Sequence, residues 1–205
     1  RGRAPVLDFR GATLAGLAND GGLYLPAEWP QLSPADLDAL ATATYAETAF
    51  RVMRPFVAGS LSDAELVALI DDAYGDFGHA AVTPLVQMDH RHWLLELFHG
   101  PTLAFKDVAL QMLGGLFGHF LRDGERITIV GATSGDTGSA AIEAVAGRPG
   151  ISIFMLHPAG RVSEVQRRQM TTVRAGNVFN IAVDGSFDDC QALVKTLFND
   201  AAFRA

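Results

Sequence analysis

The feature that most restricts the fold of this sequence is a regular alternation of short apolar runs and amphipathic segments after Arg126. The runs expected to be strands are Arg126–Val130, Ile151–Leu156 and Val178–Val183. The helices expected after them are Ser139–Ala146, a segment capped by Ser163 and Gln166 that Gly176 ends, and Phe187–Phe198. Because such alternation is typical of βαβ units, the sequence predicts an α/β fold with a parallel sheet and flanking helices.

The first eighty residues carry a different, mainly helical pattern. Helices are expected from Ser33-Pro34 through Leu40, over Tyr45–Phe56, and after a capping box of Ser62 and Glu65 with Leu61 and Leu66 as its hydrophobic staple. Leu23–Leu25 is expected to be only a short extended segment. We therefore predict a helical subdomain over residues 1–80, packed beside the sheet without adding a central strand to it. Residues 81–205 are predicted to form the α/β domain.

A long apolar segment connects these two regions. Trp93–Phe98 reads as a buried strand, and the glycine and proline of His99–Thr102 break it. The helix expected next, up to Leu121, has two apolar rows: Val108, Met112, Leu116 and Phe120, then Ala109, Leu113, Phe117 and Leu121. Such a broad apolar face must be buried against other elements.

Lys106 lies at the start of this helix, between Phe105 and Asp107. A helix N-terminus and an apolar environment both disfavour the charged amine, and a neutral lysine can form a Schiff base with an aldehyde cofactor. The ordinary alternative is a lysine that reaches solvent and pairs with Asp107. The local sequence alone favours that alternative.

Gly131–Gly138 reads as a glycine-rich loop between a strand and a helix. Its G-x-x-x-G-x-x-G spacing differs from the dinucleotide fingerprint, and it lacks the Gly-Lys-Ser/Thr of a nucleotide P-loop. A structural turn is an equal alternative on spacing alone. However, Thr133, Ser134 and Thr137 gather hydroxyl groups at a helix N-terminus, where parallel sheets bind ligands and backbone amides meet anions.

Two longer motifs carry a family resemblance. Leu97–Asp107 (LFHGPTLAFKD) resembles the pyridoxal-phosphate lysine segment of the threonine synthases, and Ala132–Gly138 (ATSGDTG) resembles their substrate and cofactor loop. Weaker similarity covers Gly16–Pro26 and Val183–Lys195, so the resemblance extends over nearly the whole chain. It implies a fold-type II pyridoxal-phosphate enzyme, with an architecture like the β subunit of tryptophan synthase.

The resemblance also implies roles for single residues. Lys106 would carry pyridoxal 5'-phosphate and move protons at the substrate, and the other expected cofactor contacts are Phe105, Ser134 and Asp136. The residues expected to bind substrate are Thr133, Ser134, Gly135, Asp136, Thr137 and Arg161. For Arg161 the ordinary alternative is a solvated arginine beside a capped helix. Many related enzymes have asparagine at the position of Asp136, so the acid favours threonine synthase over the cysteine synthases and dehydratases.

The implied reaction converts O-phospho-L-homoserine and water to L-threonine and phosphate. The alternatives are a serine/threonine dehydratase or cysteine synthase, and a non-catalytic module that keeps the fold. The resemblance further implies a continuation beyond Ala205, with the cup for the cofactor phosphate and the partner of the pyridine nitrogen. The 205-residue chain alone is therefore expected to be an incomplete, inactive catalyst.

Composition restricts the remaining possibilities. A net charge of −7 and a pI near 5.2 give no basic surface for nucleic acid. His90 and His92 have no matching third ligand in the sequence nearby, so no metal site is expected. A single cysteine, Cys190, and the lack of a membrane-length apolar run predict a cytoplasmic protein without membrane partners. We expect a monomer or a homodimer.

Overall fold

The computed structural model describes residues 2–204, so residues 1 and 205, the outer ends of the two predicted domains, lie outside the description. The described helices are α1 (Phe9–Ala15), α2 (Pro34–Leu40), α3 (Tyr45–Val57), α4 (Asp63–Tyr74), α5 (Asp107–Phe120), α6 (Asp136–Val145), α7 (Glu164–Thr171), α8 (Phe187–Asn199) and α9 (Ala201–Arg204). The described strands are β1 (Leu85–Gln87), β2 (Trp93–Leu95), β3 (Ile127–Ala132), β4 (Ile151–Pro158) and β5 (Val178–Val183). None of these helices is long and apolar enough to cross a membrane.

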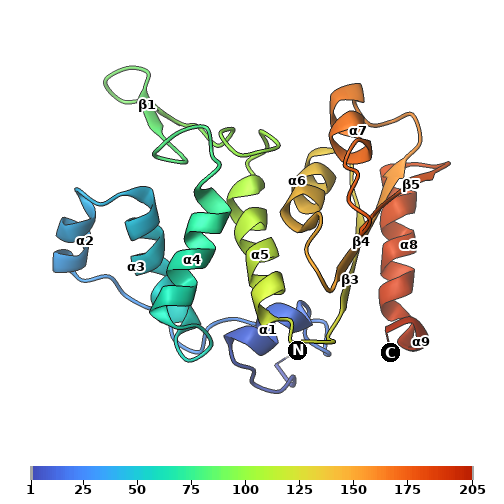
Figure 1. The fold of residues 1–205 in the computed structure, drawn as a ribbon, viewed down its shortest axis with the longest axis horizontal. Helices are drawn as coiled ribbons and strands as arrows, with labels where there is room; N and C mark the ends of the chain where they lie inside the picture. Colours follow the sequence, from blue (N-terminus) through green and yellow to red (C-terminus); the bar gives the residue numbers. More distant parts are fainter. Residues whose placement is uncertain (1, 205) are drawn as a thin grey trace.

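The elements are stacked in layers (Figure 1). α3 packs on α4, α4 on α5, and α5 on α6. α6 packs on β4, and α8 covers the opposite side of the sheet through contacts with β3 and β4. The sheet therefore lies between α6 and α8, while the N-terminal helices extend outward from α5.

The sheet is parallel, with strand order β3-β4-β5. β4 is the central strand and is largely buried, and its register pairs Ile127 with Ile151 on one side and Ile153 with Val178 on the other. A continuous apolar run is what a strand covered on both faces requires. The predicted α/β class and parallel sheet are confirmed, and Leu23 makes only an isolated bridge to Leu17 outside that sheet.

The helix starts follow the capping chemistry expected from the sequence. Ser33 accepts a hydrogen bond from the Asp36 amide with Pro34 at the first helical position, and α2 begins there. Ser62 and Glu65 form a reciprocal capping box at the start of α4. Each box satisfies backbone N–H groups that have no partner within the helix.

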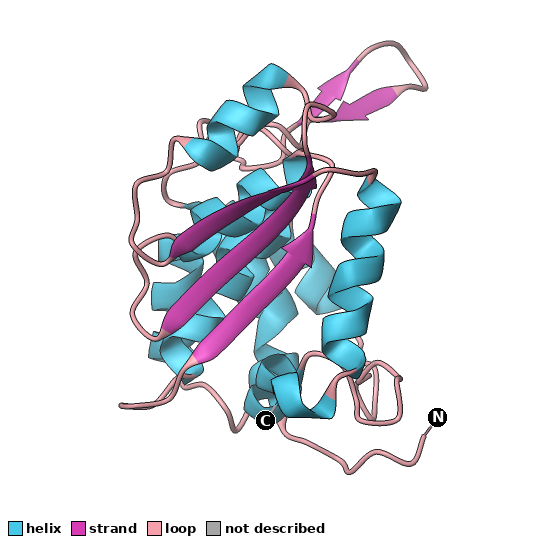
Figure 2. Ribbon diagram, turned by 90° about the vertical axis from the view of Figure 1, so that its right-hand side faces the viewer, coloured by secondary structure: helices cyan, strands magenta, loops and turns pink. Residues whose placement is uncertain are grey.

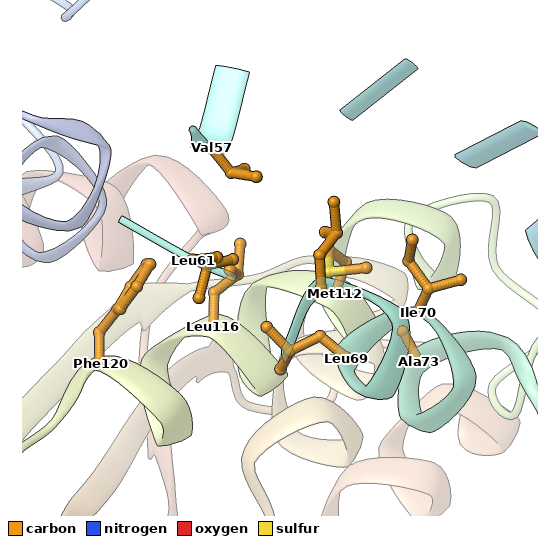
Figure 3. Packing of buried hydrophobic residues seen from close by; sticks show 9 residues of the cluster. Val57, Leu61, Leu69, Ile70, Ala73, Met112, Leu116 and Phe120 are labelled. Carbon is orange, nitrogen blue, oxygen red and sulfur yellow. The ribbon is translucent and has the colours of Figure 1, made fainter. Parts of the chain in front are cut away.

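Two hydrophobic clusters hold the layers together. The helical cluster joins α3, α4 and α5 and comprises Val57, Leu61, Leu66, Leu69, Ile70, Ala73, Met112, Leu116 and Phe120 (Figure 3). The sheet cluster comprises Ile142, Ala144, Val145, Ile151, Ile153, Met155 and Met170. α5 contributes to both, because its second face places Leu110 and Phe117 against the sheet cluster. The predicted broad apolar face of α5 is thus divided between two partners.

The prediction of a buried strand over Trp93–Phe98 is wrong. Only Trp93–Leu95 is a strand, and it pairs antiparallel with β1 in a two-stranded hairpin. Figure 2 shows this hairpin beyond the end of the parallel sheet. All three residues are exposed, at 46–57% of their surface. An apolar run of this length does not distinguish a central strand from an uncovered one.

Several other boundaries differ from the prediction. α6 begins at Asp136 rather than at Ser139, and β3 extends to Ala132, so the glycine-rich loop shortens to residues 133–135. α7 ends at Thr171 with Thr172 as its C-cap, so Gly176 does not end it. Glycines inside Gly131–Gly138 suggested a loop, but Gly138 lies in a helix where only a residue without a side chain fits.

Candidate active site

Lys106 lies directly before the first turn of α5, and its amine meets a carboxylate from another helix. Its Nζ donates a hydrogen bond to Oδ2 of Asp136 at 2.5 Å. The same Nζ lies 4.3 Å from the centroid of the Phe105 ring. The Lys106 side chain is 25% exposed and that of Asp136 is 38% exposed, so solvent reaches both members of the pair.

Lys106 pairs with Asp136 and not with Asp107, the neighbour that the sequence offered as its partner. Asp107, the adjacent acid, is fully buried and bonds to Thr102 instead. The hydrogen bond from Lys106, more than any other influence, holds the pKa of Asp136 below its ordinary value. Lys106 is therefore held as half of an ion pair, rather than as a lysine in apolar surroundings.

Asp107 fixes the loop that leads to Lys106. Its carboxylate accepts the backbone N–H of Thr102 at 2.8 Å and the Thr102 hydroxyl at 2.7 Å. Gly100 packs so closely that a Cβ there would lie 2.5 Å from the Asp107 carboxylate. Between these contacts, Leu103 adopts φ +63°, a conformation that is uncommon for a residue with a side chain. The loop is thus held in one strained shape directly before the lysine.

Thr133 organises the second loop, at the carboxyl end of β3. It is buried, and its Oγ1 accepts the backbone N–H groups of Gly135 at 2.9 Å and of Gly138 at 2.8 Å. Gly135 has φ +144°, a value that residues with side chains rarely adopt, and a Cβ there would collide with the Gln166 amide. This geometry turns the chain sharply into α6 and presents Asp136 as the first residue of that helix.

The remaining predicted residues lie around these two loops. Ser134 and Thr137 are exposed beside Asp136, and the Thr137 amide donates to Asp136 Oδ1. Arg161 is exposed in the turn after β4, at the same carboxyl edge of the sheet as Thr133. After the hydrogen bonds from Ser186, the charge of Arg161 also lowers the pKa of Asp189. The structure therefore brings Lys106, Phe105 and Asp136 into contact and leaves Arg161 facing solvent.

Comparisons with known proteins match this chain to threonine synthases. Residues 1–74 match the family described as threonine synthase N terminus. The threonine synthase of Pseudomonas aeruginosa is 55% identical over 204 residues, which are 99% of this chain and 44% of that protein. The chain belongs to the threonine synthase family.

Solved structures of threonine synthases have the same fold. The structure of PLP-bound threonine synthase from Brucella melitensis superimposes with a TM-score of 0.93 at 55% identity, over 98% of this chain and 44% of that one. Yeast threonine synthase gives a TM-score of 0.90 at 45% identity, over 97% of this chain and 42% of that one. The chain thus spans less than half the length of these threonine synthases, and it matches their N-terminal portion.

Sequence reasoning about threonine synthase motifs missed two residues of α7. Gln166 packs against Gly135, and Gln169 donates from Nε2 to the Thr102 carbonyl at 3.0 Å. Only the capping role of Gln166 was expected, and its amide does accept the Ser163 hydroxyl. The available signal was their spacing: three residues apart on a helix, the two side chains share one face.

Among the described residues, no three His, Cys, Asp or Glu side chains gather closely enough to hold a metal ion. His92, one of the two histidines considered for metal binding, instead pairs with Asp89 inside the turn before β2.

Proposed function

We propose that this chain provides the lysine-bearing part of a pyridoxal-phosphate-dependent threonine synthase, which converts O-phospho-L-homoserine and water to L-threonine and phosphate. The observation that carries the proposal is the contact between Lys106 and Asp136, each from a separate family motif. Family membership at 40–55% identity to the most similar curated proteins supports threonine synthase over the dehydratase and cysteine synthase alternatives.

The residues present fit the aldehyde end of the cofactor. Lys106 offers a primary amine on a partly exposed side chain, and the Phe105 ring lies beside it. Asp136 can orient the amine before the cofactor arrives and remain beside it afterwards. When bound, the pyridine ring supplies an electron sink for charge that develops on the substrate carbons.

The chain's own groups then divide the remaining work. In this proposal the Lys106 amine moves protons at Cα and Cβ of the substrate. The start of α6 carries the exposed hydroxyl groups of Ser134 and Thr137 where the helix dipole favours an anion, and Gly135 sets the turn between them. That is the proposed position of the substrate carboxylate. Thr133 stabilises this turn rather than contacting the substrate, because its buried hydroxyl accepts the N–H groups of Gly135 and Gly138.

Other groups must come from elsewhere in the complete enzyme. We propose that the region found in the longer relatives supplies the phosphate cup and the pyridine-nitrogen partner, so the isolated chain is inactive. Arg161 is retained as a candidate for substrate phosphate, since guanidinium groups bind phosphate oxygens well. We also propose a cytoplasmic location, which is consistent with the free, buried Cys190. The proposed oligomeric state is a monomer or a homodimer.

Covalent labelling tests the role of the lysine directly. The sequence holds two lysines, Lys106 and the exposed Lys195 on α8. Borohydride treatment of the cofactor-loaded enzyme should fix the label on Lys106 and spare Lys195. Lys106→Ala should abolish the label and phosphate release, whereas Lys195→Ala should keep both. A label that persists in Lys106→Ala would refute the assignment.

Substrate choice separates the alternatives within the cofactor class. The complete enzyme should release phosphate and threonine from O-phospho-L-homoserine. Release of pyruvate or 2-oxobutyrate from serine or threonine as the main activity would indicate a dehydratase instead. A protein that takes the label yet turns over none of these compounds would be the non-catalytic module.

A further inference from the structure

α7 touches both loops of the candidate site from one face. Its Gln169 donates from Nε2 to the Thr102 carbonyl in the lysine loop at 3.0 Å. Its Gln166, one helical turn earlier, lies against Gly135 in the loop that presents Asp136. Neither glutamine belongs to the motifs that carry the family resemblance. One helix thus connects the two segments that bring Lys106 and Asp136 together.

The bond from Gln169 completes the hydrogen bonding of Thr102. The Asp107 carboxylate accepts hydrogen bonds from the N–H and the hydroxyl of Thr102, and Gln169 donates one to the Thr102 carbonyl. Asp107 directly follows Lys106 in the sequence. These three hydrogen bonds therefore fix the backbone on both sides of the lysine. The strained Leu103 lies inside the same loop. A loop in an uncommon backbone conformation keeps it only while surrounding contacts enforce it.

α7 is itself firmly anchored. Met170, beside Gln169, is buried, and a Cβ on Gly138 of α6 would lie 2.6 Å from its Sδ. Asn180 of β5 donates from Nδ2 to the Met170 carbonyl at 3.0 Å. The position of Gln169 is therefore set by the sheet and by α6, rather than by the lysine loop that it holds.

We propose that Gln169 is a positioning residue, which fixes Lys106 relative to Asp136 by holding the Thr102 carbonyl. The proposal rests on the proposed function, in which Lys106 reacts with the cofactor aldehyde. Gln169 reaches Lys106 only through Thr102 and Asp107, so its effect should appear in how well the amine is placed for that reaction.

The test replaces Gln169 in the cofactor-loaded enzyme. Gln169→Met keeps the length of the side chain and removes the N–H donor. Loss of one such hydrogen bond should weaken pyridoxal-phosphate binding roughly 3- to 10-fold, with a matching fall in borohydride-fixed label on Lys106 at subsaturating cofactor. The matched control is Gln191→Met, which removes an exposed glutamine on α8 that bonds to Lys195, and it should leave both quantities unchanged.

A second variant separates positioning from general stability. In Gln169→Glu an ionised carboxylate cannot donate to the Thr102 carbonyl, whereas a protonated carboxyl group can. Cofactor affinity should therefore recover on acidification in Gln169→Glu relative to Gln169→Met. The ionisable side chains near these loops, among them His99, Lys106, Asp107 and Asp136, are the same in both variants, so the comparison isolates the effect of residue 169.

The outcomes are distinguishable from failure of the proposed function. Weakened cofactor binding in Gln169→Met together with acid recovery in Gln169→Glu supports the inference. Unchanged binding in Gln169→Met, while Lys106→Ala loses the label, overturns the inference and leaves the proposed function standing. A wild-type enzyme that takes no label on Lys106 overturns both.

Discussion

Lys106 and Asp136 meet at the starts of two helices that pack side by side, with Nζ 2.5 Å from Oδ2. Asp136 is the first residue of α6, where the helix dipole favours an acid, whereas Lys106 precedes α5, where it disfavours a cation. The Asp136 carboxylate therefore offsets the unfavourable interaction between the Lys106 charge and the dipole of α5. This relationship predicts how the stability of the protein depends on pH.

Asp136→Asn should remove a pH-dependent part of the stability. Because the hydrogen bond from Lys106 lowers the pKa of Asp136 below 3.8, the ionised form contributes stability at higher pH and loses it as pH falls through the lowered value. For a partly exposed pair the effect is about 0.2–1 kcal/mol at pH 7. Urea unfolding of both proteins should show a difference at pH 7 and at pH 5 that shrinks below about pH 3.8. A difference that stays constant into strong acid would contradict the prediction.

Two glycines of α5 should respond in opposite directions to the same substitution. A Cβ on Gly114 would collide with the Ala144 carbonyl of α6, whereas on Gly118 the nearest atoms belong to Arg148 at 3.8 Å. Gly114→Ala should cost at least about 1–3 kcal/mol of unfolding free energy through overpacking. Gly118→Ala should be neutral or stabilise by up to about 1 kcal/mol, because alanine is the better helix former. Similar unfolding midpoints for the two variants would show that the helices separate more easily than this packing implies.

Gly135→Ala should destabilise the protein and disturb the site. The φ of +144° is unfavourable for alanine, and the new Cβ would displace Gln166 from its place against the loop. The expected loss is about 1–3 kcal/mol, measured by denaturant unfolding. Gly176→Ala is the matched control, since nothing lies within 4 Å of a Cβ at that position. Equal effects of the two substitutions would argue against strain at Gly135.

The isolated 205-residue chain should bind pyridoxal phosphate poorly. Without the proposed phosphate cup it lacks several charge-assisted hydrogen bonds of roughly 1.5–3 kcal/mol each. Affinity should be at least about 100-fold weaker than in the complete enzyme, as measured by absorbance titration. Stoichiometric binding, or threonine formation at the rate of the complete enzyme, would show that the cofactor site is already whole within these residues.

Capping chemistry and strand–helix alternation made much of the fold predictable. Ser33 and Ser62 act through bonds within three residues of sequence, so their helices could be placed from sequence alone. β5 follows its apolar run residue for residue. The exposure of Trp93 could not be foreseen, because burial depends on which elements pack over a strand.

The candidate site was predictable only in part, for a similar reason. The motifs placed Lys106 and Asp136 in the site, but their pairing joins positions 30 residues apart. Asp107 was considered a surface partner of Lys106, and its burial against Thr102 depends on the turn that Leu103 makes. Gln169 carries no local signal of its bond to Thr102, since the two are 67 residues apart. Long-range polar contacts of this kind follow from tertiary packing.

α5 packs against both hydrophobic clusters. Met112, Leu116 and Phe120 belong to the helical cluster, and Leu110 and Phe117 pack against the sheet cluster. Neither cluster can open without uncovering part of this helix, so amide protons in α4 and α6 should exchange with solvent in one cooperative event. Lys106 lies directly before the N-terminus of this helix. The position of Lys106 therefore depends on the packing of both clusters. A core mutation in either cluster should shift the amine relative to Asp136.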